Sequence, residues 1–161
     1  MINGSITKFD YLLRVCVIVF ATISPFICLF FSGYEKSLSS YWNTNMQPLF
    51  IISNLITGYY LIGIPKWRLS SCLLLLVTAF SIEYYPSIHN IIAVAFFVVC
   101  IYPLYMANKY DFCKWIYLSA IPVIPFSLLF AEIIAIVAIC MFHLLTLNKL
   151  YTIQKERVEP N

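Results

Sequence analysis

The stretch that decides the fold is WIYLSAIPVIPFSLLFAEIIAIVAICMFHLLTL, residues 115–147. It is apolar almost throughout and carries one acidic residue, Glu132, near its middle. About 20 helical residues cross the hydrocarbon core of a bilayer, so this run is too long for a single crossing. Pro122 and Pro125 lie in its first half, where we expect them to kink a helix. We therefore predict two spans, divided at residues 130–132.

The rest of the chain has the same apolar character. Hydrophobic residues make up 62% of the 161 positions and charged residues only 11%, against roughly 25% charged in ordinary soluble domains. A soluble fold of this size has no interior large enough for so much apolar surface. We predict an all-α membrane protein with one domain, residues 1–161, that ends in a cytoplasmic tail at 148–161. The predicted spans of this six-helix bundle are about 15–31, 48–64, 69–84, 88–106, 115–130 and 131–147.

The positions of lysine and arginine predict the orientation. With six spans, one side of the membrane receives nine of the ten Lys and Arg residues, and the other side receives only Lys36. Cytoplasmic loops collect Lys and Arg, so both termini are predicted to be cytoplasmic, in the inner membrane if the source is bacterial. The nine are Lys8, Arg14, Lys66, Arg68, Lys109, Lys114, Lys149, Lys155 and Arg157.

Several polar residues are predicted to share one depth, at the outer boundary of the membrane. Two carboxylates and an imidazole at one depth can bind a cation, relay a proton or form an acid–base pair. The alternative is structural, because Glu132 near a helix N-terminus is favoured by the helix dipole and Ser87 can cap the fourth span. The candidates are Ser37, Ser39, Tyr41, Thr44, Glu83, His89 and Glu132.

The last predicted span also carries a polar stripe, formed by Cys140, His143 and Thr146. We expect this stripe to face the interior of the bundle, since exposing it to lipid would be costly. It serves either hydrogen-bonded packing or an ion path. Asn54 and Gly58 in the second span form a small and polar face that suits close helix contact.

Catalytic motifs are missing from the sequence. There is no H-E-x-x-H, no G-x-S-x-G and no phosphate-binding glycine loop. The two histidines, His89 and His143, are predicted in opposite halves of the membrane, where they cannot share one zinc ion. The six cysteines show no C-x-x-C spacing. We therefore predict no catalytic residue, no metal site, no cofactor and no nucleic-acid partner.

Three short motifs resemble a family of uncharacterised bacterial multi-pass membrane proteins. Residues 37–44, SLSSYWNT, match its S-x-S-x-Y-[YW]-x-T pattern before the second span, although Ile52 replaces a glycine usual in that family. The resemblance implies a six-span bundle and directs attention to the same outer layer. It brings no known activity. The other matching residues are Leu49, Phe50, His89, Ala93, Phe96, Phe97, Glu132 and Ala135.

These observations lead to three functional hypotheses. The first is a non-enzymatic membrane protein that senses or binds a ligand, a lipid or a protein partner near the outer leaflet. The second is a small channel formed by a homo-oligomer, or a membrane-perturbing or immunity factor in bacterial conflict. The third is a membrane-embedded hydrolase that uses Glu83, His89 and Glu132. The expected partners are the lipid bilayer, another copy of the chain, and a membrane or cytoplasmic protein.

Overall fold

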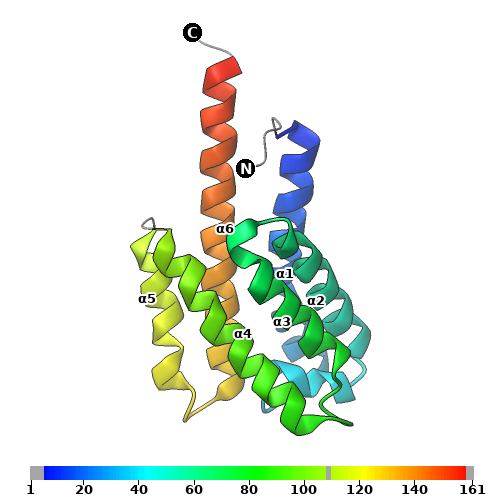
Figure 1. Ribbon diagram of the computed structural model, residues 1–161. Coiled ribbons are helices and arrows are strands. Elements are labelled where there is room, and N and C mark those ends of the chain that lie inside the picture. Colours follow the sequence, from blue (N-terminus) through cyan, green and yellow to red (C-terminus); the bar gives the residue numbers. More distant parts are fainter. Residues whose placement is uncertain (1–5, 108–109, 159–161) are drawn as a thin grey trace.

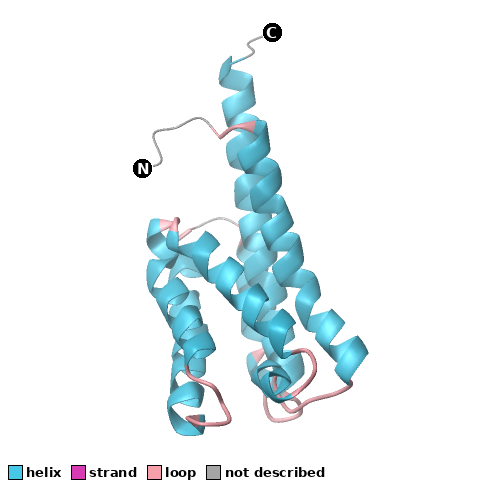
Figure 2. Ribbon diagram, turned by 90° about the vertical axis from the view of Figure 1, so that its right-hand side faces the viewer, coloured by secondary structure: helices cyan, strands magenta, loops and turns pink. Residues whose placement is uncertain are grey.

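The computed structural model describes residues 6–107 and 110–158, and this part of the chain is entirely helical, without strands (Figures 1 and 2). Three of the helices, α1, α4 and α6, are long and apolar enough to cross a membrane. This confirms the all-α prediction and the character of a membrane protein. The elements are α1 (Lys8–Ser32), η1 (Leu38–Asn43), α2 (Gln47–Ile62), η2 (Pro65–Trp67), α3 (Arg68–Ala79), α4 (Pro86–Met106), α5 (Asp111–Ser119), η3 (Ile121–Val123) and α6 (Leu128–Val158), where η denotes a 3₁₀ helix.

Successive α-helices run in alternating directions, so the first and last described residues lie at the same end of the bundle (Figure 1). We call this the terminal end; it also holds the α2–α3 and α4–α5 connections. The opposite, distal end holds η1 and the α3–α4 and α5–α6 connections (Figure 1).

Two helices project beyond the others at the terminal end, as both ribbon views show (Figures 1 and 2). This stalk consists of residues 6–13, mostly from α1, and residues 148–158 of α6. The rings of Tyr11 and Tyr151 stack there with centroids 4.3 Å apart. The side-chain amide of Gln154 makes two hydrogen bonds to the backbone of Ile6. Its oxygen accepts from the Ile6 N–H at 2.7 Å, and its nitrogen donates to the Ile6 carbonyl at 3.0 Å.

The first helix begins earlier than predicted, at Lys8 instead of Val15, because residues before it cap its N-terminus. Thr7 Oγ1 accepts from the backbone N–H of Asp10 at 3.0 Å, and Asp10 Oδ2 accepts from the backbone N–H of Thr7 at 3.3 Å. This reciprocal pair satisfies two of the free donors at a helix start.

The break between the last two helices also differs from the predicted position. Helix α5 ends at Ser119, and α6 begins at Leu128, so residues 130–132 lie inside α6. Pro122 and Pro125 lack backbone donors, and here they end a helix instead of kinking one. The side chain of Ser127 accepts from the backbone N–H of Phe130 at 3.2 Å and caps the new helix.

Helix α4 begins at Pro86, a favoured residue for a first helical turn. Its N-cap is Tyr85, which makes no side-chain capping bond, so the prediction that Ser87 caps this helix is wrong. Both Pro25 in α1 and Pro103 in α4 lie within continuous helices.

Much of the outer surface is apolar, as expected where lipid replaces water. Phe30, Ile91 and Phe126 expose 82%, 70% and 88% of their side chains. The interior forms around α6, whose small buried residues Ala135 and Ala138 allow neighbouring helices to approach. The described molecule is thus apolar both inside and outside.

Helices α2 and α3 approach closely at Gly58. A Cβ atom on Gly58 would lie 2.7 Å from Cδ2 and 2.9 Å from Cγ of Leu75. In addition, Ser71 Oγ donates a hydrogen bond of 2.6 Å to the Gly58 carbonyl. The absence of a side chain at Gly58 therefore sets the distance between the two helices.

Candidate functional site

The predicted outer layer falls into two groups at the distal end. The first group joins η1 to α6, because the backbone N–H of Leu38 donates to Glu132 Oε2 at 2.6 Å. Glu132 is only 8% exposed and lies in the second turn of α6, beyond the helix start where it was predicted. This hydrogen bond between residues 94 positions apart thus holds η1 on the bundle.

The other predicted residues of η1 support this short helix from within. Tyr41 is fully buried, and its hydroxyl donates to the carbonyl of Gly33 at 2.8 Å. Thr44 Oγ1 donates to the carbonyl of Tyr41 at 2.9 Å. Ser37 and Ser39 are both buried. Together these contacts make η1 a packed cap over the distal end of the bundle.

The second group lies on the α3–α4 connection. His89 is fully buried, and its Nδ1 lies 2.6 Å from the carbonyl oxygen of Phe80. A carbonyl only accepts, so Nδ1 carries the proton; Nε2 is buried with no hydrogen-bond partner in residues 6–107 and 110–158. Glu83 is exposed, and its backbone N–H donates to Ser81 Oγ at 3.1 Å.

The structure therefore does not assemble an acid–base pair from these residues. Within the described chain, no hydrogen bond or ion pair joins Glu83, His89 and Glu132 to one another. The same residues contain no group of three His, Cys, Asp or Glu side chains that could hold a metal ion.

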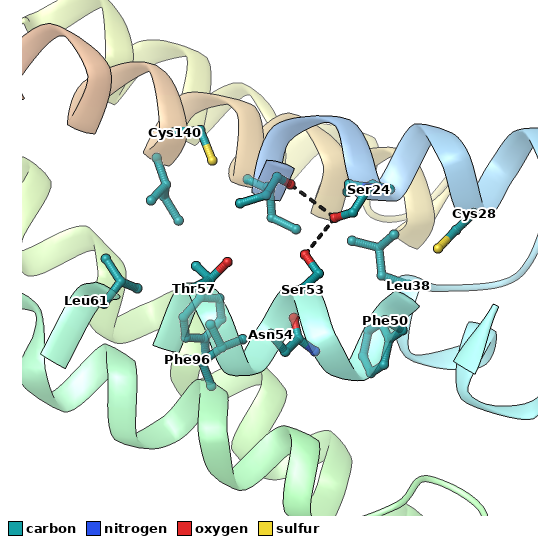
Figure 3. Close-up of a pocket in the computed structure, with 15 residues that line it drawn as sticks. Ser24, Cys28, Leu38, Phe50, Ser53, Asn54, Thr57, Leu61, Phe96 and Cys140 are labelled. Atoms are coloured by element: carbon teal, nitrogen blue, oxygen red, sulfur yellow. Dashed lines mark hydrogen bonds between the residues drawn. The ribbon is translucent and has the colours of Figure 1, made fainter. Parts of the chain in front are cut away.

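A cavity of about 70 Å³ lies between α1, α2 and α6, beneath η1 (Figure 3). Most of its wall is apolar, with Cys28, Leu38 and Phe50 towards the distal end. Two hydroxyl groups cross it: the Oγ atoms of Ser24 and Ser53 are 2.7 Å apart, and both serines are buried. The further polar side chains and the thiol on the wall are Asn54, Thr57 and Cys140.

Two more spaces lie next to this cavity towards the terminal end, each sharing wall residues with the one before it. A space of about 20 Å³ shares Thr57 and Cys140 with the cavity and adds Tyr60 and His143. A groove of about 610 Å³ between α1 and α2 shares Val17 and Tyr60 with that small space. The three spaces follow one another along α1 and α2, and we call this series the seam.

His143 lies at the narrow part of the seam. Its ring packs against Trp67 and Tyr60, with centroids 4.5 and 5.5 Å away. The imidazole is buried, and its Nε2 has no hydrogen-bond partner among the described residues. A space of this size has room for about one water molecule, which needs polar partners of this kind. Of the other two stripe residues, Cys140 is buried and Thr146 is half-buried.

Sequence reasoning missed the Ser24–Ser53 pair and the groove. The signal available was weak, because Ser24 is an isolated hydroxyl in an apolar helix next to Pro25. Its partner is 29 positions away, and only the rotation of α1 against α2 brings the two together.

The fold and the seam define a helical-bundle membrane protein with an internal cavity. Comparison with models of protein families, with curated proteins and with solved structures finds no match to this chain. Its function is therefore argued from its own geometry.

Proposed function

We propose that the chain crosses the membrane six times with both termini in the cytoplasm. The alternating helix directions support this topology, because they put both described chain ends at one end of the bundle (Figure 1). The basic residues support it too: Lys36 is at the distal end, whereas the terminal end and stalk hold Lys8, Arg14, Lys66, Arg68, Lys114, Lys149, Lys155 and Arg157. Lys109 lies outside the described residues.

Three helices are short for a full crossing. At 1.5 Å per residue, α2, α3 and α5 are ~24, ~18 and ~14 Å long, against a hydrocarbon core of roughly 30 Å. The bilayer thins locally around such helices, at a modest free-energy cost. Six crossings therefore imply a thinned membrane beside α3 and α5.

Single cysteines in a cysteine-free background test this topology. Lys36 and Ser87 are exposed at the distal end, and Lys66 is exposed at the terminal end. In intact cells, an impermeant thiol reagent should label cysteines at the first two positions and spare the third. Labelling at position 66, or none at 36 and 87, would exclude this orientation.

For the function, we propose a non-enzymatic protein that binds a small molecule in the cavity beneath η1. The observation that carries this proposal is the Ser24–Ser53 hydroxyl pair, which is buried in an otherwise mostly apolar cavity. Such a wall suits a ligand with an apolar body and one hydrogen-bonding group. In the proposed orientation the distal end of the cavity faces the outer leaflet, and η1 covers it there. A ligand therefore enters from the outer leaflet, at η1.

The cavity is small, and its size limits which ligands can bind without a movement of the chain. Pockets for drug-sized ligands span about 300–1,000 Å³, whereas this cavity measures about 70 Å³. A larger ligand has to displace η1, which Glu132 holds through Leu38. Binding would thereby change the position of η1, as a sensor requires, and present a different surface to a protein partner.

A cavity-filling substitution tests the binding site. Ser53→Leu puts a larger apolar side chain into the cavity, whereas Leu55→Phe adds bulk to a residue that is 47% exposed on the same helix. Small molecules extracted from the purified proteins would be compared by mass spectrometry. A compound that accompanies the wild type and Leu55→Phe, and is lost from a folded Ser53→Leu, supports the proposal. Equal retention in all three proteins would refute it.

The second candidate is a conduction path along the seam, in a channel-forming oligomer or a bacterial immunity factor. The series of three neighbouring spaces, which share wall residues from the cavity past His143 to the groove, favours it. Proton flux into liposomes should then be present in the wild type and absent in His143→Phe. A flux that is absent from the wild type would eliminate this candidate.

The hydrolase hypothesis has the weakest support, because Glu83 is exposed and Glu132 and His89 have separate backbone partners. The family resemblance stays a prediction. Its first motif covers η1 and its third includes Glu132, and the Leu38–Glu132 hydrogen bond connects these two segments.

A further inference from the structure

The groove at the terminal end lies between the first turns of α1 and the last turns of α2. Its volume is about 610 Å³. Its floor and rim include Arg14 of α1, Tyr59 and Tyr60 of α2, and Gly63, the residue that follows α2. Helix α2 ends there, and the polar residue Lys66 follows shortly after. The groove thus lies beside the charged start of α1, a helix long and apolar enough to cross a membrane.

Arg14 is half-buried in this groove, and no ion pair to it is present in residues 6–107 and 110–158. The nearest acidic residue along the helix is Asp10, which also lines the groove. Its Oδ2 accepts from the backbone N–H and the hydroxyl of Thr7, at 3.3 and 2.7 Å. Asp10 therefore serves the helix cap, and the guanidinium remains able to bind an anion.

The walls of the groove are apolar and outward-facing. Leu13 and Ile62 expose 54% and 41% of their surfaces, and Ile56 exposes 38%. Apolar walls do not attract a free inorganic anion, but they match acyl chains. A guanidinium pairs with phosphate through two parallel hydrogen bonds.

We propose that this groove binds one anionic phospholipid. The phosphate pairs with Arg14, and the acyl chains lie against Leu13, Val17 and Ile56. The surrounding basic residues favour a headgroup with net negative charge over a zwitterionic one. This inference is independent of the ligand in the cavity beneath η1. It holds whichever face of the membrane the terminal end occupies.

Native mass spectrometry of the detergent-purified chain tests the proposal, with dioleoyl phosphatidylglycerol and dioleoyl phosphatidylcholine as competing probes. The wild type should bind one phosphatidylglycerol in preference to phosphatidylcholine. Arg14→Gln should lower the affinity for that molecule about tenfold, as loss of a charge-assisted contact. Arg14→Lys should have a smaller effect, because it keeps the charge and loses the planar fork.

Lys149→Gln is the matched control, since it removes the same charge from an exposed site on α6 outside the groove. Its affinity should stay near that of the wild type. Gly63→Phe tests the groove without changing a charge. A Cβ atom there meets only the Tyr60 carbonyl oxygen, at an ordinary 3.5 Å, and Gly63 lines the groove, so an added ring should reduce the space for a lipid.

Thermal melting of each variant shows whether it folds. If Arg14→Gln fails to fold, Arg14→Lys and Gly63→Phe decide the question. The proposal is overturned if Arg14→Gln and Lys149→Gln weaken binding equally, or if folded Gly63→Phe binds like the wild type. Excess inorganic phosphate should leave the lipid bound; displacement would show a site for the free anion instead.

Discussion

Removing the carboxylate of Glu132 should release η1 from the bundle. In Glu132→Ala the buried backbone N–H of Leu38 loses its acceptor. A buried donor without a partner costs about 1–3 kcal/mol. Since 1.4 kcal/mol corresponds to a factor of ten, η1 should open roughly 5–150 times more often. Glu132→Gln keeps an oxygen acceptor, so we expect a change of less than about fivefold.

Cys28 reports this opening. It is 2% exposed and packs against Leu38 and Tyr41, directly beneath η1. In a protein whose other five cysteines are replaced, N-ethylmaleimide should react with Cys28 faster by the same factor of about 5–150 in Glu132→Ala, because labelling follows the population of the open form.

Cys100 supplies the control. It is fully buried and belongs to a different part of the core, around α4 and α6. A protein that retains only Cys100 should label at the same slow rate with and without Glu132→Ala. Two results would refute the reasoning: an unchanged rate at Cys28, or an equal acceleration at Cys28 and Cys100, which would indicate global unfolding.

Two further predictions concern helix packing and capping. Gly58→Ala should lower the melting temperature, because the added Cβ forces Leu75 to move, and the middle of the overpacking range, about 2 kcal/mol, exceeds the roughly 1 kcal/mol that alanine gains in a helix. Leu75→Ala should then cost less in the Gly58→Ala background than in the wild type; additive losses would contradict the contact. Thr7→Val should remove about 0.5–2 kcal/mol from the start of α1 and accelerate hydrogen exchange there. Exchange at the start of α4 should not change, and parallel acceleration at both helices would exclude a local effect.

The sequence predicts position along the bundle better than rotation about a helix axis. Helix α4 lies within two residues of its predicted bounds, because Pro86 and a polar segment delimit one apolar run. Glu132 and His89 were predicted in one layer, and both lie near the starts of helices, α6 and α4, that begin at the distal end. Their hydrogen bonds nevertheless go to different segments, one to η1 and one to the end of α3. Which face of a helix meets which neighbour depends on packing that no local pattern contains.

The predicted ends of the long helices fail for a related reason. Hydropathy shows where an apolar run stops, but a helix can continue beyond that point where its side chains contact another helix. Residues 148–158 are polar and were predicted as a tail, yet they extend α6 because Tyr151 and Gln154 contact Tyr11 and Ile6. The break before α6 was placed at Glu132 because charge was the most visible interruption. The observed break lies earlier in the apolar run, around Pro122 and Pro125.

The stalk has a mechanical consequence for events inside the bundle. The part of α6 that belongs to the stalk, residues 148–158, is ~16 Å long. The same two helices, α1 and α6, form the stalk and line one side of the cavity, whose facing wall comes from α2 (Figure 3). Both helices are continuous from the level of the cavity to the stalk. A shift of either helix at the cavity is therefore carried to the stalk tips, where it is available to a protein partner.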